Sequence, residues 1–260
     1  MRAAIGLGCL LLASNAQAQG SPICTDRPAK ANAVCTVPAG RVQLESSLLG
    51  WSLTETRDAR VEVVTAGSTV LKYGLTDHSD LQLAATPYVR IKSKAAGQSG
   101  SIEGPGDVMV RYKRRLTASA APVQVAIIPF VKIPTATRGI GNRKVEGGIA
   151  VPVSFTLAGP IIATFGPEID LLADADGHGH HAALVNLVNL SAAVAPRLTA
   201  AGELWSNLNF DPAGTVRQAS ADVAMAYALS GNVQIDAGAN AGLTRDTPEI
   251  EMYAGLSVRF

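Results

Sequence analysis

One segment of the chain gathers potential metal ligands, and it lies between two stretches rich in apolar residues. Three of the four histidines lie there, beside two aspartates, and imidazole and carboxylate groups together can bind zinc, copper or nickel. The spacing of the aspartates also resembles the start of a calcium-binding loop, but Val185 occupies the twelfth position, where a glutamate is required. The surrounding glycines are equally typical of a polar surface loop. We expect no functional metal and no other cofactor, and the alternative ligand set is Asp174, Asp176, His178, His180 and His181.

Catalysis by a serine hydrolase would require a serine, a histidine and a carboxylate that converge. The sequence has no G-x-S-x-G motif, and His78 lies on a predicted turn, far along the chain from the other histidines. No motif places a serine beside the histidine-rich segment. We therefore expect that the protein is not an enzyme, and an outer-membrane lipid hydrolase is the least favoured alternative.

A larger set of charged residues follows the alternation of the predicted strands. If these strands form a barrel, the residues would line its lumen, with basic residues on three consecutive strands and acidic residues on the later strands. The two opposed arcs of charge would produce an electric field across the lumen that orients polar solutes. An alternative is that these charges pair with one another and fill the interior. The residues are Arg90, Lys92, Arg111, Lys113, Arg115 and Lys132 on the basic side, and Glu146, Glu168, Asp170, Glu203, Asp222, Asp236 and Glu251 on the acidic side.

The elements that must position these residues are strands, because apolar residues recur at i, i+2 and i+4 through most of the chain. The final stretch from Ile250 to Phe260 shows the pattern most clearly, and it ends on an aromatic residue, as the closing strand of an outer-membrane barrel does. Runs of ten or more residues suit tilted crossings of a bilayer better than a soluble sheet. The predicted strands are 40–52, 61–73, 79–92, 106–116, 122–134, 144–158, 160–172, 182–194, 198–210, 215–229, 232–244 and 249–260.

The connections between these strands alternate between short turns and longer polar loops, as they do in outer-membrane barrels. An even number of strands places both chain termini on the periplasmic side. The sequence therefore predicts an all-β fold: a transmembrane antiparallel up-and-down β-barrel of about 12 strands, in the bacterial cell outer membrane. Aromatic residues that could form the interfacial girdles are few, with Trp51 and Tyr88 expected near the outer rim.

The N-terminus has the features of a secretory signal. Arg2 precedes an apolar run, and Ala16-Gln17-Ala18 provides small residues at the cleavage site, so we expect residues 1–18 to be a signal peptide. Residues 19–39 form a predicted periplasmic segment in which Cys24 and Cys35 pair as a structural disulfide. About twenty residues are too few to fill a lumen, so we expect no plug, and residues 40–260 form the predicted barrel.

Charge and hydropathy exclude other classes of protein. The chain carries 22 basic and 21 acidic side chains, and removal of the signal peptide removes only Arg2 from this balance. The mature chain is thus formally neutral and has no polybasic tract, which argues against nucleic acid as a partner. No later stretch reaches 18 consecutive apolar residues, so the sequence offers no transmembrane helix.

Several short motifs resemble those of one known family of proteobacterial outer-membrane proteins. They are Cys24 to Pro28, Cys35 to Gly40, Lys72 to Asp77, Ile127 to Thr135, Gly139 to Asn142, Gly166 to Asp170 and Ser257 to Phe260. The family is labelled "putative meta-pathway of phenol degradation" and is often described as a transporter. The resemblance covers nearly the whole mature chain, and its label implies a link to the degradation of aromatic compounds.

The sequence therefore favours a channel for the passive passage of small solutes, and the family label implies aromatic compounds or their breakdown products. The main alternative is a closed structural or adhesive barrel. We expect outer-membrane lipids, the barrel assembly machinery and small-molecule solutes as partners, with Phe260 as part of the assembly signal. The solute, the open or filled state of the lumen and the oligomeric state are left open by the sequence.

Overall fold

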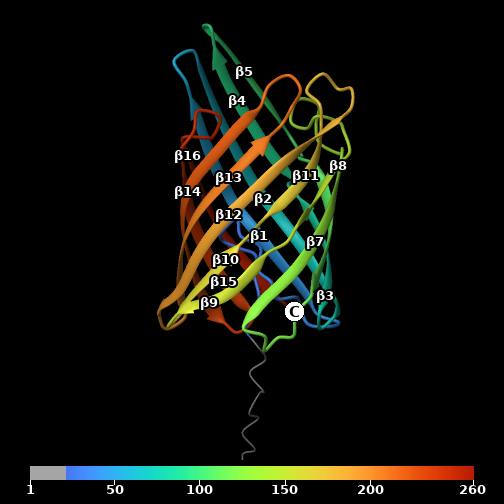
Figure 1. Ribbon diagram of the computed structural model, residues 1–260. Helices are drawn as coiled ribbons and strands as arrows, with labels where there is room; N and C mark the ends of the chain where they lie inside the picture. Colours follow the sequence, from blue (N-terminus) through green and yellow to red (C-terminus); the bar gives the residue numbers. More distant parts are fainter. Residues whose placement is uncertain (1–21) are drawn as a thin grey trace, which may run out of the picture.

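The protein is described by a computed structural model that covers residues 22–260, so the predicted signal peptide over residues 1–18 lies outside the described residues. One antiparallel sheet of sixteen strand segments closes on itself as a barrel (Figure 1). Within the described range, no helix is long and apolar enough to cross a membrane. The strands are β1 (Val42–Glu55), β2 (Ala59–Thr76), β3 (Ser79–Ala85), β4 (Tyr88–Ala95), β5 (Gln98–Gly104), β6 (Val108–Arg115), β7 (Val123–Ile133), β8 (Glu146–Ala150), β9 (Val153–Ala158), β10 (Ile161–Phe165), β11 (Glu168–Ala173), β12 (His180–Ala195), β13 (Leu198–Asn209), β14 (Val216–Ser230), β15 (Val233–Gly242) and β16 (Ile250–Arg259).

The sixteen segments form twelve barrel strands, as predicted, because four of the barrel strands are each interrupted once. The interrupted pairs are β3 with β4, β5 with β6, β8 with β9, and β10 with β11. Each interruption contains a proline: Pro87, Pro105, Pro152 or Pro167. Proline has no backbone N–H to donate to the ladder, so the regular hydrogen bonding stops locally while the chain continues in the wall.

The barrel is closed by β1, which pairs with β16 on one side and with β2 on the other. Both described ends of the chain lie at one end of the barrel, which we call the terminal end; the opposite end is the loop end (Figure 1). At the closure, the backbone N–H of Phe260 donates to the carbonyl oxygen of Val42 over 2.8 Å. The Phe260 side chain is exposed on the outside of the wall.

The wall is apolar outside and polar inside, the reverse of a soluble protein. Leu204 and Val223 are 60% and 64% exposed, whereas Lys72, Asp80 and Lys113 are each 1% exposed. In water such an arrangement would expose a large apolar surface and bury charge at high cost. The arrangement is stable when lipid covers the outer face, and it matches the alternation expected of a membrane barrel.

One predicted loop is a β-hairpin. The sequence predicted a loop over residues 93–105, but β4 and β5 extend through this range and join at a tight turn where Ala96 and Gly97 have φ of 49° and 80°. The hairpin is among the tallest features of the loop end (Figure 1). Beyond the membrane both faces of a sheet meet water, so the apolar alternation that identifies a membrane strand disappears although the pairing continues.

Candidate functional site

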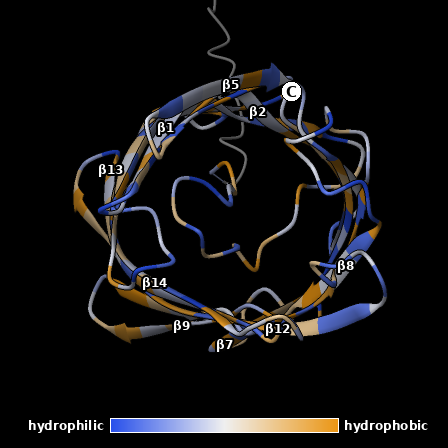
Figure 2. Ribbon diagram, turned by 90° about the horizontal axis from the view of Figure 1, so that it is seen from above, coloured by the Kyte–Doolittle hydropathy of each residue, from blue (hydrophilic) through white to orange (hydrophobic). Residues whose placement is uncertain are grey.

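The lumen contains the N-terminal segment, residues 22–38, which we call the plug (Figure 2). The plug begins at the terminal end, where the N–H of Ile23 donates to Gly231 over 2.9 Å, and returns there, where the N–H of Gly40 donates to Gly74 over 2.9 Å. The predictions that this segment is periplasmic and that the lumen holds no plug were therefore wrong, since its side chains bind the lumen wall. The lumen is so narrow that one extended loop occupies its centre (Figure 2).

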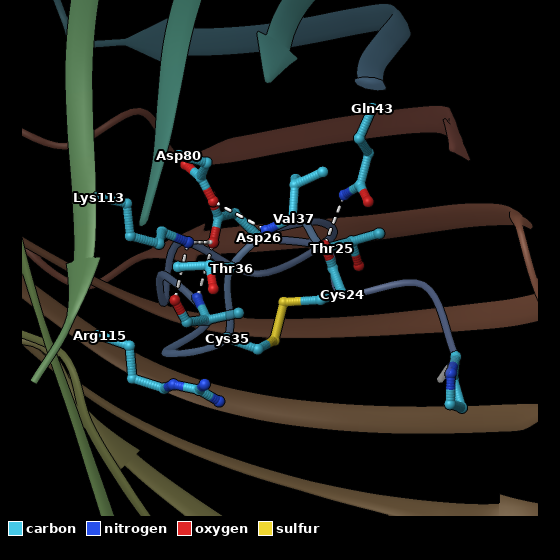
Figure 3. The surroundings of a disulfide bond; sticks show 12 residues. Cys24, Thr25, Asp26, Cys35, Thr36, Val37, Gln43, Asp80, Lys113 and Arg115 are labelled. Atoms are coloured by element: carbon cyan, nitrogen blue, oxygen red, sulfur yellow. Dashed lines mark hydrogen bonds and ion pairs between the residues drawn. A yellow bond between two sulfur atoms is a disulfide. The ribbon is translucent and has the colours of Figure 1, made fainter. Parts of the chain in front are cut away.

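The Cys24–Cys35 disulfide is confirmed, with Cα atoms 6.1 Å apart. It closes the plug into a loop inside the lumen, close to the wall residues Gln43, Asp80 and Lys113 (Figure 3). The Gln43 side-chain amide donates to the carbonyl oxygen of Cys24 over 2.5 Å, and the Val37 N–H donates to Asp80 over 3.0 Å. The cross-link thus holds together the two limbs of a loop that the wall binds on both sides.

On one side of the lumen, the plug places a carboxylate between two buried lysines. Asp26 lies 2.6 Å from Lys72 on β2 and 2.5 Å from Lys113 on β6. Lys72 also pairs with Glu45 on β1 over 2.5 Å, and Lys113 donates to the carbonyl oxygen of Ala33 over 2.8 Å. Removal of one partner from such a cluster leaves an uncompensated charge in a poorly solvated place, which costs about 3–5 kcal/mol.

On the opposite side, the plug presents cations to a wall of carboxylates. Arg27 makes two hydrogen bonds to Asp236 on β15, of 2.6 and 3.2 Å. Lys30 lies 2.7 Å from Asp222 on β14, and Glu203 on β13 accepts the backbone N–H groups of Lys30 and Ala31 at 3.1 and 2.9 Å. Lys113 from the predicted basic side and Glu203, Asp222 and Asp236 from the predicted acidic side thus bind the plug.

The remaining predicted lining residues of the basic side lie at three different heights along the barrel axis. Arg111 donates to the side-chain oxygen of Asn32 in the plug. Arg115 lies at the terminal end and bonds the imidazole of His78 at 2.7 Å. Lys132 lies towards the loop end and pairs with Glu146 at 2.8 Å and with Asp107 at 3.2 Å.

The remaining acidic residues lie closer to the plug or beside one another. Glu251 accepts a hydrogen bond from Asn240 over 2.8 Å and is 4.0 Å from the Lys30 ammonium group. Glu168 and Asp170 stand two positions apart on β11 and so point to the same face of the wall. Among the predicted lining residues, an ion pair thus joins Lys132 and Glu146, whereas Glu168 and Asp170 place two carboxylates side by side.

Arg90 and Lys92 do not line the lumen. Ala66 on β2 pairs with Tyr88, whereas Thr69 pairs with Ala85, so two residues on each strand separate the two ladders. Gly67, with φ of 69°, and Pro87 lie in this break. Below it the even-numbered Gln82 is buried in the lumen, and above it the odd-numbered Val89 is buried instead. The prediction failed because it continued a strict alternation across a proline.

The plug residues that contact both walls were missed as functional residues. Asp26, Arg27 and Lys30 lie in a segment without periodicity, and no rule of alternation assigns it to a lumen. Lys72 was detectable, because it stands between Leu71 and Tyr73, which are both exposed on the outer face. An isolated charge between two lipid-facing residues indicates a lumen residue, and a buried lysine requires a carboxylate nearby.

Two of the cavities formed by residues 22–260 lie beside the plug. One of about 340 Å³ lies against β1, β2 and β16 and is lined by Ser52, Thr65 and Tyr253. The other, of about 320 Å³, lies against the wall from β8 to β13 and is lined by Pro152, Leu187 and Trp205. Lys30 lines both, with its ammonium group 4.8 Å from the centre of the Trp205 ring. This plug residue therefore stands between the two cavities.

The histidine-rich segment forms a loop at the loop end, and its side chains diverge. His181 is 2.8 Å from Asp174 and 3.7 Å from Asp211. The Asp176 carboxylate instead accepts the backbone N–H of His178, and the His180 ring is 3.3 Å from the carbonyl oxygen of Val145. Among residues 22–260, no group of three His, Cys, Asp or Glu side chains is arranged to hold a metal ion.

Asp211, in the neighbouring loop, is tied to this segment by hydrogen bonds. It accepts the N–H groups of Ala213 and Ala175 over 2.7 and 2.9 Å. The bond from Ala213 has the largest effect and, with the others, lowers the pKa of the Asp211 carboxyl despite some burial. The carboxylate therefore stays charged and fixes one loop against another.

Comparison with solved structures supports the fold. A crystal structure of the COG4313 outer membrane channel from Pseudomonas putida F1 matches with a TM-score of 0.70 at 12% identity, over 87% of this chain and 98% of that chain. The translocator domain of the autotransporter NalP from Neisseria meningitidis matches with a TM-score of 0.55 at 10% identity, over 86% and 90% of the two chains. The NanC porin matches with a TM-score of 0.51 at 8% identity, over 84% and 98%. At these identities the likeness concerns the fold alone.

Comparison at the level of sequence identifies the family. No curated protein matches the chain. The model of the family described as "Putative MetA-pathway of phenol degradation" matches residues 25–260, which include most of the plug and the entire barrel. The chain therefore belongs to this family.

Proposed function

We propose that the protein is an outer-membrane channel for the passive passage of small solutes, and not an enzyme. The observation that carries this proposal is the polar lumen, in which a plug held by side-chain contacts leaves a cavity on each side. The relation in fold to an outer-membrane channel and a porin supports it. Outer-membrane lipids and the barrel assembly machinery are the partners that this location requires.

The charges beside the plug favour some solutes over others. On the acidic side, the four carboxylates Glu203, Asp222, Asp236 and Glu251 face only two plug cations, Arg27 and Lys30. The surplus of carboxylates raises the local concentration of cations and lowers that of anions. We therefore expect neutral and cationic solutes to pass more readily than anions.

The lining of the second cavity suits the class of compound that the family label names, small aromatic molecules. Its lining of Pro152, Leu187 and Trp205 is largely apolar, whereas Lys30 and Glu168 provide polar groups at its edge. A cavity of this kind suits a small ring with one or two polar substituents, since the ring covers apolar surface while its substituents remain hydrogen-bonded. Small aromatic compounds are therefore the solutes that we propose to test first.

The test is reconstitution of two proteins: the mature chain and a variant that lacks residues 22–38. Single-channel recording and liposome swelling with sugars, amino acids and small aromatic compounds would measure passage. We expect low conductance from the mature chain and several-fold higher conductance from the variant, because the plug and its charges occupy the centre of the lumen. A change in gel mobility on boiling would verify that both barrels are folded.

Absence of any ion or solute flux through either folded protein would contradict the proposal. The closed structural or adhesive barrel would then be the better assignment, with the loop end as its working surface.

A further inference from the structure

The shift of register in β4 places a row of basic side chains on the outside of the barrel. Arg90, Lys92 and Lys94, which we call the outer basic ladder, follow Tyr88 at every second position and so share its face. Arg90 pairs with Val64, which pairs with Trp51, and Trp51 pairs with the outward-facing Met252. The ladder is therefore a continuation of the lipid-facing wall towards the loop end.

The height of the ladder corresponds to the headgroup layer. Aromatic residues such as Trp51 and Tyr88 mark the interface between hydrocarbon and water. Two residues of a strand tilted at about 40° climb about 5 Å, and the headgroup layer on each side of the hydrocarbon is about 5–8 Å thick. Arg90, about 5 Å above Tyr88, thus lies at the level of the lipid headgroups. Lys92 lies about 10 Å above Tyr88, close enough for its long side chain to reach back to this layer, and Lys94 lies about 5 Å further out.

The carboxylates on this face already have partners, whereas the ladder does not. Arg60 pairs with Glu55 at 2.9 Å and with Glu62 at 3.1 Å, and Glu103 accepts a hydrogen bond from Tyr88 at 3.1 Å. Within residues 22–260, neither Lys92 nor Lys94 forms an ion pair or a side-chain hydrogen bond, although both are exposed. Four cations and three carboxylates leave this face with a surplus of one positive charge.

One donor of the ladder is buried without an acceptor. The Nε atom of Arg90 is shielded from solvent and has no hydrogen-bond partner in the described part of the chain. A buried, unsatisfied donor costs about 1–3 kcal/mol unless a ligand or water provides an acceptor. On the same stretch of wall, a hollow of about 520 Å³ is lined by Arg60, Lys92, Lys94, Ser99 and Ser101, whose side chains carry hydrogen-bond donors. The Glu62 carboxylate also lines it and is paired with Arg60 at 3.1 Å.

We propose that the outer basic ladder binds the phosphate groups of an anionic glycolipid, lipopolysaccharide, in the outer leaflet. Lysine and arginine form short charge-assisted hydrogen bonds with phosphate oxygens, and serine hydroxyls can donate to the same groups. A site on the outer wall at headgroup height meets a lipid that is anchored in the same membrane. The inference concerns the outer surface and does not depend on passage through the lumen.

The test compares the full mature chain with the double variant Lys92→Glu/Lys94→Glu, purified from outer membranes. Bound lipid A per protein would be measured by mass spectrometry, and affinity by titration of the detergent-solubilised protein with lipopolysaccharide. Each lysine near an anionic surface contributes about a fivefold gain in binding, so we expect at least about tenfold weaker binding. Because neither lysine has a protein partner, the variant should retain the gel mobility of a folded barrel.

Arg217→Glu is the matched control. Arg217 also lies on an outer face at the loop end, since it pairs with Leu208, which is exposed to lipid, but it belongs to β14 and not to the ladder. Binding by the control should stay within about twofold of the unmodified chain, as one isolated charge contributes little. Equal binding by the double variant and the unmodified chain, or an equal loss in the control, would overturn the proposal.

Two further titrations identify the source of the phosphate. Dephosphorylated lipopolysaccharide should bind at least about tenfold more weakly than the intact lipid, because the contacts are with phosphate. Inorganic phosphate should fail to displace the lipid at millimolar concentration. Displacement by inorganic phosphate would instead indicate a site for free phosphate, and unchanged binding of the dephosphorylated lipid would indicate recognition of the acyl chains; either result contradicts the proposal.

Discussion

At the scale of single residues, Asp26 is the point at which the plug is most sensitive. It is the carboxylate that pairs with the buried Lys113, and it shares Lys72 with Glu45. We expect Asp26→Asn to weaken the attachment of the plug by about 3–5 kcal/mol, because Lys113 is left without its ion-pair partner. Limited proteolysis of the 22–38 segment in the folded barrel would measure the release.

Glu55→Gln is a suitable comparison, because it also removes a carboxylate from an ion pair. Glu55 pairs with Arg60 near the loop end, and both side chains are more than 40% exposed. Exposed pairs contribute about 0–1 kcal/mol, so this variant should leave the plug protected from protease. Equal protection in both variants would show that Asp26 does not anchor the plug.

The sequence predicted the charges of the wall better than their partners. Glu203, Asp222 and Asp236 were assigned to the lumen because strict alternation holds along β13, β14 and β15. Their partners Arg27 and Lys30 could not be assigned, since they lie in a segment without a repeating pattern, about 170 to 210 residues away in the chain. Complementary charge binds the two regions together, and charge complementarity leaves no periodic signal.

At the scale of elements, β14 allows a test of the lipid-facing register. Val223 is 64% exposed near the middle of the strand, and Leu229 lies on the same face at the terminal end. Val223→Arg should reduce the free energy of unfolding by about 2–4 kcal/mol, whereas Leu229→Arg should cost about 0–1 kcal/mol near the interface. Urea titration in lipid vesicles would compare them. Equal costs would mean that the outer face of β14 does not span the hydrocarbon.

The closing strand provides a second test at this scale. The backbone N–H of Phe260 donates to Val42 at the β1–β16 seam, and its exposed side chain continues the apolar outer face. Deletion of Phe260 should lower the amount of inserted protein several-fold, because β16 loses part of its pairing and the aromatic residue that we propose as part of the assembly signal. Immunoblots of outer-membrane fractions would measure insertion, and normal levels would contradict the assigned role.

The strands themselves could be predicted because each crosses between lipid and a polar lumen. All twelve were located by alternation, and the alternation failed where the physical cause of the pattern is absent. Pro87 interrupts the ladder and reverses the faces of the following residues, so Arg90 and Lys92 were placed on the wrong side. The β4–β5 hairpin rises above the membrane, where both faces meet water and no alternation is required.

At the scale of the whole molecule, the disulfide determines how well the plug is ordered. Cys24 and Cys35 close a loop of ten intervening residues, and both limbs of that loop contact the wall. In the chain-entropy description, such a cross-link contributes about 3 kcal/mol to the ordering of its loop. Cys24→Ser/Cys35→Ser should therefore leave the barrel folded but give larger and more variable single-channel currents than the parent. Indistinguishable currents would show that the wall contacts alone order the plug.

The contacts of Asp26 and Arg27 also have a consequence for the order of assembly. Asp26 binds residues 46 and 87 positions away, in the first half of the barrel, whereas its neighbour Arg27 binds Asp236, 209 positions away. Bringing together residues so far apart in the chain costs conformational entropy before the contact adds any stability. The contact with Asp236 therefore forms late. The disulfide-closed loop is therefore expected to attach first to β2 and β6 and to be enclosed only when β15 and β16 reach β1. The lumen is thus built around its occupant during folding, and no later step of threading is needed.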